Sequence, residues 1–374
     1  MEKRLIYLDR LKVLLTVLVV LHHTAITYGG SGGWFYYEHR DNVVVNTLLT
    51  MFTAVNQSFF MGLFFFISGF VTPASYDRNG AVSFLKARLF RFGIPLLFYM
   101  LVIAPLLQYV ASGYEGSLGT FIHKEIVTEP FQGVLAFAVG PLWYLEALLL
   151  FFAGYAGFRR LTAGKVRGKR IAMTPRLITG YVIIVAAANF AIRLVYPVGE
   201  EALNLQLAYF PAYIGLFMAG IAAYRGQWLE QLTQEAARKW KRAALSLIVL
   251  MAAGMAFGGA MDGDVSAFMG GASWQSAFYA TIDPLMGVGI SYALLVGFRN
   301  RWNGGATKVT GWLSANAFLV YILHALVVTY VSFALRGLDW NPMMKFAMVG
   351  CSAVFLSYTA ASFIRRIPGV KRVV

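Results

Sequence analysis

Long runs of apolar residues, separated by short polar segments, dominate the pattern of this chain. Each run has about 20 residues or more, the length that an α-helix needs to cross the hydrocarbon core of a bilayer. The connecting segments are too short to hold a separate soluble domain. The pattern therefore predicts an all-α fold, a polytopic membrane helix bundle formed by the single domain 1–374. We count ten candidate spans, at residues 11–30, 46–73, 92–112, 134–157, 177–196, 205–224, 243–261, 275–298, 312–335 and 343–364.

Composition supports the membrane assignment. Charged residues make up 13% of the chain, about half of the roughly 25% that is typical of soluble proteins. Hydrophobic residues make up 59%, and the mean hydropathy is +0.63. A soluble protein with so few charges would lack the polar surface that it needs in water.

The distribution of basic residues predicts an orientation. If the N-terminus is cytoplasmic, 27 of the 32 Lys and Arg residues fall in inner segments, and the outer loops are acidic. Such an excess is the positive-inside pattern, which favours both termini in the cytoplasm. It also explains the net charge of +15 without a nucleic-acid partner. The most basic stretch, FRRLTAGKVRGKRIAMTPR at residues 158–176, is interpreted as a topology determinant beside anionic lipid.

Cysteine and histidine usage argues against a metal site or a disulfide. The single cysteine, Cys351, cannot form a disulfide within the chain. The five histidines are scattered, so we expect no metal. The first apolar run is longer than the core of a signal peptide, and we expect it to be retained as a span.

Ionisable residues inside membrane spans are costly and are candidate functional groups. At about 1.5 Å per residue, His23 lies roughly 16 Å along a helix from Lys12, which puts it beyond the centre of the bilayer. His324 reaches a similar depth. Several such groups can therefore meet in the outer half of one bundle. The ionisable residues within the predicted spans are His22, His23, Glu146, Arg193, Asp283 and His324.

Each of these residues also has a structural interpretation. His324 can simply hydrogen-bond a neighbouring helix. Asp283 precedes Pro284 and can satisfy a broken helical turn, and Arg193 is expected to snorkel to the outer interface. His22 points about 100° away from His23 on a helix and is expected to be structural. The aromatic residues at span ends are interpreted as interfacial anchors, and they include Trp34, Tyr36 and Tyr37.

The opening RLIYLDRLKVLLTVLVVLHH resembles the start of the membrane acyltransferase-3 family, bacterial enzymes that acylate surface glycans and other exported molecules. Its mark is a basic residue, ten residues and then histidine, and Lys12 and His23 fit this spacing. Further family-like segments follow in order along the chain. They are LFFFISGFVTPASY around Ser68, FLKARLFRFGIP with Arg88 and Arg91, GPLWYLEALL with Trp143 and Tyr144, LAYFPAYIGLFMAGIAAYRGQWLE, WLSANAFLVYILHALVV with Tyr321 and His324, and RRIPGVKRVV.

The resemblance implies a mechanism with an inner donor and an outer acceptor. The donor is expected to be acyl-CoA, with acetyl-CoA as the first choice, and Arg88, Arg91 and Lys12 are expected to bind its phosphates. His23 is expected to take a proton from the acceptor hydroxyl as general base. A covalent acyl-histidine is the less favoured variant.

Other residues have supporting roles in this prediction. Either Glu146 or Asp283 is expected to orient the imidazole of His23. Ser68 and Tyr321 are expected to hydrogen-bond donor or acceptor. Trp143 and His324 complete the predicted substrate contacts. Some family members carry an appended extracytoplasmic hydrolase-like domain, which this sequence does not show, so the acceptor stays open.

The location implied is the bacterial inner membrane, with the lipid bilayer, acyl-CoA and an extracytoplasmic hydroxyl acceptor as partners. A transporter or flippase of a glycan or small solute is the alternative, because it also combines many spans with ionisable groups near the membrane centre. Such proteins often contain internal repeats, and this sequence has no obvious one.

Overall fold

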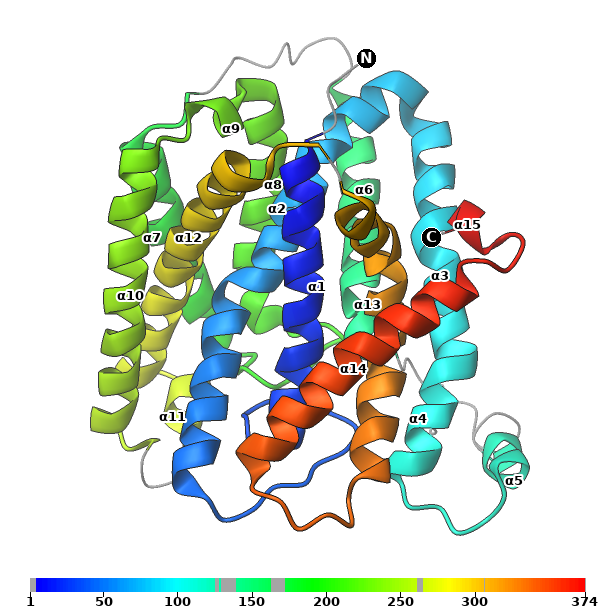
Figure 1. Ribbon diagram of the computed structural model, residues 1–374. Helices are drawn as coiled ribbons and strands as arrows, with labels where there is room; N and C mark the ends of the chain where they lie inside the picture. The colour runs from blue at the N-terminus through cyan, green and yellow to red at the C-terminus, as the bar shows by residue number, and fades with distance from the viewer. Residues whose placement is uncertain are drawn as a thin grey trace. The chain divides into compact units, whose positions relative to one another are not determined.

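The computed structural model describes residues 5–124, 128, 139–162, 172–260, 265–305 and 307–373. Within these ranges the chain is helical, apart from loops and a single β-bridge between Ala202 and Leu205. The all-α prediction is confirmed (Figure 1). The helices, with π- and 3₁₀-helical turns marked η, are α1 Ile6–Thr27, α2 Val43–Arg88, η1 Leu89–Gly93, α3 Ile94–Phe98, η2 Tyr99–Ile103, α4 Ala104–Ala111, α5 Leu118–His123, η4 Gly140–Leu142, α6 Trp143–Leu161, α7 Pro175–Arg193, η5 Leu207–Tyr209, α8 Phe210–Gly226, α9 Trp228–Gln231, α10 Gln234–Phe257, α11 Ser266–Met269, α12 Trp274–Trp302, α13 Lys308–Ala334, α14 Pro342–Ile364 and α15 Val370–Val373.

The described residues contain nine helical segments that are long and apolar enough to cross a membrane. One of them, Val43–Ala111, has 69 residues and covers both predicted spans 46–73 and 92–112. A straight helix of that length would measure about 100 Å, more than three times the hydrocarbon thickness. Its direction breaks at Gly80, whose φ of 71° and ψ of 168° lie outside the helical region. Glycine adopts this conformation without the strain that a Cβ would cause.

The remaining eight predicted spans each coincide with one helix, with shifted ends. The first helix begins at Ile6 and ends at Thr27, whereas the predicted span ran over 11–30. Residues 134–138 of the fourth span lie outside the described residues, as do residues 163–171 of the basic stretch and the N-terminal Lys3 and Arg4. The cytoplasmic placement of both termini stays a prediction.

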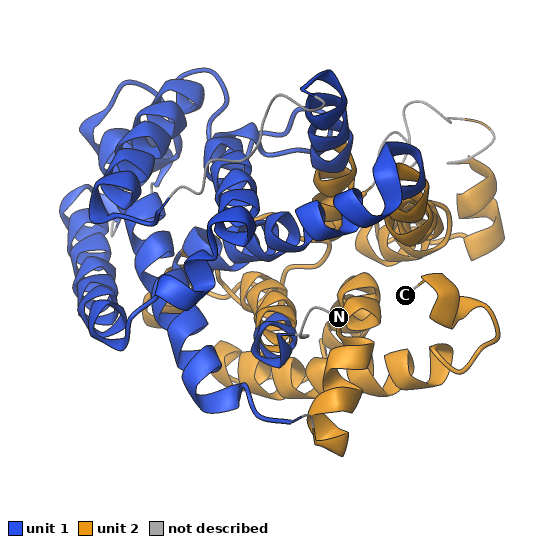
Figure 2. Ribbon diagram, turned by 90° about the horizontal axis from the view of Figure 1, so that it is seen from above, with its two compact units in different colours: residues 1–12, 55–84, 151–306 blue, residues 13–54, 85–150, 307–374 orange. Residues whose placement is uncertain are grey.

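The chain divides into two compact units, each made of three stretches (Figure 2). Unit 1 contains residues 1–12, 55–84 and 151–306, and unit 2 contains residues 13–54, 85–150 and 307–374. Each unit thus combines stretches that are distant from one another in the sequence. The prediction of a single membrane domain without a separate soluble domain stays a prediction.

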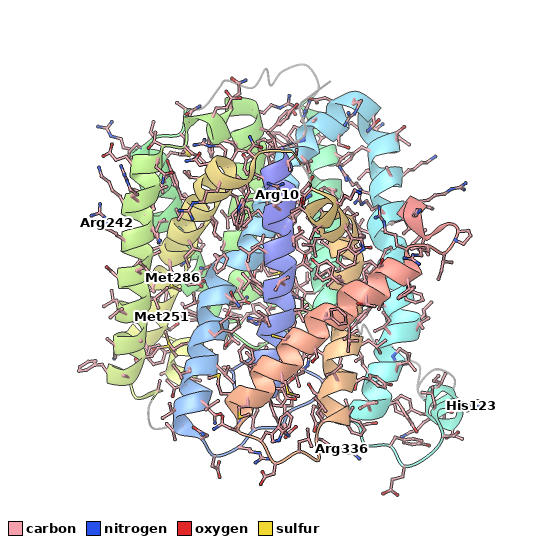
Figure 3. All side chains as sticks on the ribbon, viewed as in Figure 1. Arg10, His123, Arg242, Met251, Met286 and Arg336 are labelled. Atoms are coloured by element: carbon pink, nitrogen blue, oxygen red, sulfur yellow. The ribbon has the colours of Figure 1, made fainter. Side chains whose placement is uncertain are left out.

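Unit 1 is organised around α12. Helices α7 and α10 both pack along it, and α8 packs on α7. Met251 of α10 and Met286 of α12 are fully buried, and both are labelled in Figure 3. The guanidinium of Arg10 closes the end of α12, since it donates hydrogen bonds to the carbonyl oxygens of Trp302 at 2.6 Å and Gly305 at 2.9 Å. A cation at a helix C-terminus is favoured because the last carbonyls lack partners in the helix.

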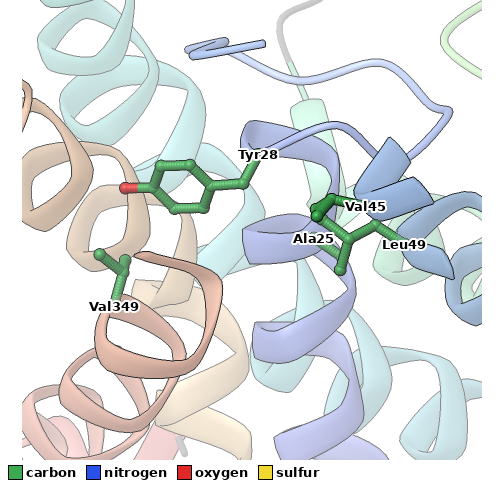
Figure 4. Packing of buried hydrophobic residues seen from close by; sticks show 5 residues of the cluster. All are labelled: Ala25, Tyr28, Val45, Leu49 and Val349. Atoms are coloured by element: carbon green, nitrogen blue, oxygen red, sulfur yellow. The ribbon is translucent and has the colours of Figure 1, made fainter. Parts of the chain in front are cut away.

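In unit 2, α13 packs along α14, and α4 packs on α13. A small apolar cluster ties α1 to the start of α2 and to α14 (Figure 4). It consists of Ala25, Tyr28, Val45, Leu49 and Val349, all at most 6% exposed. This cluster packs around the end of α1, which lies at Thr27, four residues after His23.

Two glycines in unit 1 let α2 and α8 approach backbone to backbone. A Cβ at Gly69 would lie 2.1 Å from the carbonyl oxygen of Phe217, and one at Gly220 would lie 2.1 Å from that of Phe66. Side chains at these positions would push the helices apart. Small residues at such crossings are typical of membrane helix packing.

We expect Gly69→Ala or Gly220→Ala to destabilise the protein by about 1–3 kcal/mol, the usual cost of overpacking. Thermal unfolding in detergent or nanodiscs measures the change. Gly297→Ala on α12 is the matched control, because nothing lies within 4 Å of the position that its Cβ would take. The control should be neutral or slightly stabilising, since alanine is the better helix former. Equal effects at Gly69 and Gly297 would contradict this account of the helix crossing.

Candidate active site

The ten predicted site residues divide between the two units. Unit 1 contains Lys12, Ser68 and Asp283. Unit 2 contains the other seven, which are His23, Arg88, Arg91, Glu146, Trp143, Tyr321 and His324. The structure therefore describes most of the predicted site within one compact unit.

A stack of aromatic rings in unit 2 is centred on His23. The indole of Trp34 lies nearly parallel to the imidazole, with ring centroids 4.0 Å apart and an interplanar angle of 16°. The imidazole of His324 lies 5.2 Å away at 25°. His22 meets His23 edge-on at 5.3 Å and 86°, which agrees with the different orientation expected for adjacent residues on a helix. The indole also lies 6.1 Å from the imidazole of His324, so the three rings form a triangle in which His23 contacts both of the others.

Hydrogen bonding defines the state of His324. Its Nδ1 lies 2.6 Å from the carbonyl oxygen of Tyr321, one turn earlier on α13. A carbonyl oxygen can only accept, so Nδ1 carries the proton, and in the neutral ring Nε2 is left with a lone pair. His324 itself is fully buried. The structural alternative, a hydrogen bond from His324 to a neighbouring helix, is not found among the described residues: the ring bonds within α13 and stacks on His23 of α1.

Three buried nitrogen atoms in this stack lack hydrogen-bond partners among the described residues. They are Nδ1 of His23, Nε2 of His324 and Nε1 of Trp34. A buried polar atom without a partner costs free energy, so such atoms mark places where water or a substrate binds. The stack therefore offers both donors and acceptors to a bound molecule.

Tyrosines line the side of the stack formed by α13. The hydroxyl of Tyr321 donates to the carbonyl oxygen of Pro141, in the turn before α6. The ring of Tyr144 packs edge-on against Tyr321 at 6.1 Å, and Trp143 packs edge-on against Tyr144 at 6.5 Å. Pro141 and Tyr144 of the segment GPLWYLEALL thus contact Tyr321, whose ring stacks on His324. Trp143 contacts Tyr144.

The two candidate carboxylates have different surroundings. Glu146 is partly buried on α6 in unit 2, and its Oε2 atom has no hydrogen-bond partner among the described residues. Asp283 lies in unit 1, 3.6 Å from the Nη2 atom of Arg193. Within the described residues, neither carboxylate is hydrogen-bonded to the imidazole of His23, so which of them orients that ring stays a prediction.

The expectation that Arg193 snorkels to the interface is wrong. Its side chain is fully buried, and its guanidinium lies over the rings of Tyr279 at 4.8 Å and Tyr209 at 5.4 Å. It also donates to the carbonyl oxygen of Ala208 at 3.4 Å. The buried Asp283 holds the cation inside the protein, because two opposite charges that share a low-dielectric site stabilise each other. Sequence spacing alone could not pair residues ninety positions apart.

Two basic residues of the predicted donor site lie at a π-helical turn in unit 2. Arg88 ends α2, and Arg91 lies within η1, where its guanidinium faces the ring of Phe318 at 5.7 Å. π-helical turns occur frequently at functional sites. The C-terminal helix α15 packs on η1 and brings Lys371 and Arg372 to the same part of the unit. This clustering of the tail with the arginines was not predicted.

The remaining predicted residues, Lys12 and Ser68, belong to unit 1. Lys12 forms an ion pair with Asp9 at 2.7 Å, one turn earlier on α1. Ser68 lies next to Gly69, where α2 meets α8. In the described ranges, no group of three or more His, Cys, Asp or Glu side chains is placed to hold a metal ion.

Trp34 is the site residue that sequence reasoning missed. We had interpreted it as an interfacial anchor, but its indole covers His23. Its position eleven residues after His23 follows a turn, so no helical periodicity connects the two. The only signal was the concentration of aromatic residues directly after the histidine pair.

These features define a polytopic membrane protein with a buried imidazole site. The sequence profile of the acyltransferase-3 family, described as an acyltransferase domain, matches residues 5–362, and the chain belongs to this family. Inner membrane protein YcfT of Escherichia coli K12 is 20% identical, over 98% of this chain and 94% of its own length. Glucans biosynthesis protein C is 22% identical in Salmonella typhi, over 94% of this chain and 88% of its own. The protein of the same name in Escherichia coli O157:H7 is 23% identical, over 87% and 82%. No solved structure matches the chain.

The Arg193–Asp283 pair makes a testable contribution to stability. We expect Arg193→Met to destabilise the protein by about 3–5 kcal/mol, because it leaves Asp283 buried without a counter-charge. The double variant Arg193→Met/Asp283→Leu should recover most of this loss, since it removes both charges. Thermal or denaturant unfolding of the three proteins in the same lipid measures the difference. A double variant that is less stable than Arg193→Met would contradict the pairing.

Proposed function

We propose that this protein is an O-acyltransferase of the bacterial inner membrane. It moves an acyl group, acetyl in the first instance, from cytoplasmic acyl-CoA to a hydroxyl group of an extracytoplasmic acceptor. The observation that carries the proposal is the stacked His23–His324 pair, with unpartnered ring nitrogens, in a chain of the acyltransferase-3 family. The relative that is named an inner membrane protein supports the location.

A glycan is the acceptor that the comparisons favour. Three of the proteins compared span most of this chain, and two of them are named for glucan biosynthesis. A glucan offers many hydroxyl groups and no stronger nucleophile. A hydroxyl is a weak nucleophile until its proton is removed, so the enzyme needs a base beside it.

His23 supplies this base. Its neutral imidazole takes the proton as the hydroxyl oxygen attacks the thioester carbonyl carbon. The carbon–sulfur bond then breaks, and the proton passes from the imidazolium to the departing thiolate. Atoms and charge balance over the reaction, and His23 returns to its neutral form.

His324 and Glu146 support the charged intermediate state. The Nε2 atom of His324 accepts a hydrogen bond from the bound acceptor, because its Nδ1 atom is already committed to Tyr321. Of the two candidate carboxylates, Asp283 has Arg193 as its ionic partner, whereas Oε2 of Glu146 has no hydrogen bond in the described chain. This difference favours Glu146 as the group that stabilises protonated His23.

The donor is bound through its phosphates. Arg88 and Arg91 offer planar guanidinium groups that bind phosphate in a bidentate way. Lys371 and Arg372 of α15, which packs on the same π-helical turn, add positive charge. Lys12, Ser68, Trp143 and Tyr321 remain predicted contacts to donor or acceptor.

We expect His23→Gln to lower kcat for acyl transfer by about 10²–10⁴-fold, the usual contribution of a general base. Glutamine keeps much of the volume and cannot take the proton. His22→Gln is the matched control on the adjacent residue and should retain most of the activity. Transfer of labelled acetyl from acetyl-CoA to a glucan acceptor, with the protein in lipid, measures both. Loss of transfer in His22→Gln, with full activity in His23→Gln, would reverse the assignment.

We expect Arg88→Gln and Arg91→Gln to weaken binding of acetyl-CoA about tenfold or more each, since a charge-assisted hydrogen bond contributes about 1.5–3 kcal/mol. Lys86→Gln is the control, because Lys86 is an exposed cation on the same turn of α2 and is not one of the two arginines that are predicted to bind the donor. Binding of labelled acetyl-CoA at equilibrium measures the change. If the wild type binds no acyl-CoA at millimolar concentration, the donor assignment is wrong, and transport of glycans becomes the reaction to assay.

A further inference from the structure

The loop of residues 28–42, which joins α1 to α2, carries Trp34 over the histidine stack. We call it the Trp34 loop. Trp34 lies 4.0 Å from His23 and 6.1 Å from His324, measured between ring centroids, and both pairs are nearly parallel. Its backbone N–H donates to the hydroxyl of Tyr37 at 2.5 Å within the same loop. The indole is therefore placed by the loop and not by a helix.

A buried ion pair fixes the far side of this loop to α14. The Nζ atom of Lys345 donates to Oε1 of Glu38 and, at 3.3 Å, to the carbonyl oxygen of Leu335. The side chain of Lys345 is 2% exposed and that of Glu38 is 15% exposed. A lysine of this burial is rare without a counter-charge. Glu38 and Lys345 belong to other elements than Arg88 and Arg91, the predicted donor-binding residues. The mechanism proposed above does not use this ion pair.

Backbone contacts connect Glu38 to the end of α1. The N–H of Glu38 donates to the carbonyl oxygen of Thr27 at 2.8 Å, and the ring of His39 donates to that of Ile26 at 2.8 Å. Thr27 in turn donates through its hydroxyl to the carbonyl oxygen of His23 at 3.2 Å. A continuous series of contacts thus runs from Lys345 through Glu38 to the turn of α1 that holds His23.

We infer that Lys345 and Glu38 are positioning residues, which hold the Trp34 loop closed so that the indole stays stacked on His23. The closed indole excludes water from one face of the imidazole and fixes the orientation of the ring. Without the ion pair, the loop keeps its backbone contacts near α1 but loses its anchor on α14. The effect of this positioning on catalysis rests on the proposed acyl transfer, whereas the positioning of the loop does not.

A second ion pair in the same loop provides the contrast. Arg40 pairs with Asp339, but their side chains are 40% and 89% exposed, and the Nη2 atom of Arg40 also lies 4.0 Å from Oε1 of Glu38. The hydrogen bond from Arg40 lowers the pKa of the Asp339 carboxyl, so both groups are charged at neutral pH. Exposed pairs contribute little to stability because water competes for both partners. Asp339→Asn, which removes the exposed pair and leaves Glu38 and Lys345 in place, is therefore the matched control for Lys345→Met.

The test measures the reactivity of His23 with diethyl pyrocarbonate, which carbethoxylates accessible neutral imidazoles. Peptide mass spectrometry separates His23 from its neighbour His22. In Lys345→Met and in Glu38→Gln, we expect the rate of modification at His23 to rise about tenfold or more, which corresponds to about 1.4 kcal/mol. Lys345→Arg, which keeps the charge and the donor, should restore the slow rate, and Asp339→Asn should leave it unchanged.

A double-mutant cycle with Trp34→Ala separates positioning from general loosening. If Lys345 acts through the indole, Trp34→Ala alone should raise the rate as much as Lys345→Met, and combining the two should add nothing further. The exposed His123, labelled in Figure 3, reports the activity of the reagent and should react equally in all variants. Additive effects of the two substitutions, or no change in Lys345→Met, would overturn the inference.

Kinetics then link the position of the loop to the reaction. In the acyl-transfer assay, Lys345→Met should lower kcat and leave KM for acetyl-CoA unchanged, with activity restored in Lys345→Arg. If His23 becomes reactive in Lys345→Met but wild type transfers no acyl group, the positioning stands and the proposed function fails. If wild type is active and Lys345→Met reacts and transfers normally, the positioning fails and the proposed function stands.

Discussion

Hydrocarbon offers no hydrogen bonds, so each polar group that a membrane span carries must find its partner within the protein. Two groups of buried polar side chains respond to this constraint differently. In unit 1, Arg193 and Asp283 are buried as opposite charges, with two tyrosine rings beside the guanidinium. In unit 2, the imidazoles of His23 and His324 stack on each other and on Trp34, and several ring nitrogens remain without partners. The first arrangement pairs two opposite charges, although Nη1 and Nη2 of Arg193 and Oδ1 of Asp283 have no hydrogen-bond partner among the described residues. The second arrangement has no such pair of charges, and its ring nitrogens are available to a bound molecule.

This difference separates residues that sequence reasoning had grouped together. Asp283 and Glu146 were equivalent as carboxylates within spans, and both were expected near His23. The ion pair accounts for Asp283 without any catalytic role, because an arginine that is fully buried requires a counter-charge. In the part of the chain that the structure describes, Oε2 of Glu146 has no hydrogen-bond partner, and Glu146 belongs to unit 2, as the imidazoles do. The physical argument therefore favours Glu146, although the spacing of the two residues in the sequence favours neither.

The length of the apolar runs was sufficient to predict the helices, because the thickness of the bilayer sets the length of a span. It could not show that spans 46–73 and 92–112 belong to one helical segment, since the break at Gly80 depends on a single backbone conformation. The stacking of His324 on His23 was partly predictable from their similar depth. The contacts of Trp34 with His23 and of Lys345 with Glu38 were not predictable, because both involve the loop 28–42, and loop conformation leaves no periodic signal in the sequence. Arg193 was mispredicted because snorkelling is the usual outcome only when no buried carboxylate is within reach.

The family-like segments of the sequence also have distinct physical tasks in this structure. The glycine of the ISGF segment, Gly69, permits a close crossing of α2 and α8, so this part of the resemblance reflects packing. In the KARLFR segment, Arg88 ends α2 and Arg91 lies within the π-helical turn that follows it, so this part of the resemblance concerns charge. The LHH and YILH segments meet in the imidazole stack. A motif can thus be shared for its shape, its charge or its chemistry, and only contacts between side chains distinguish these cases. By that criterion, the histidine stack and the loop that covers it are where the chemistry of this protein is most directly tested.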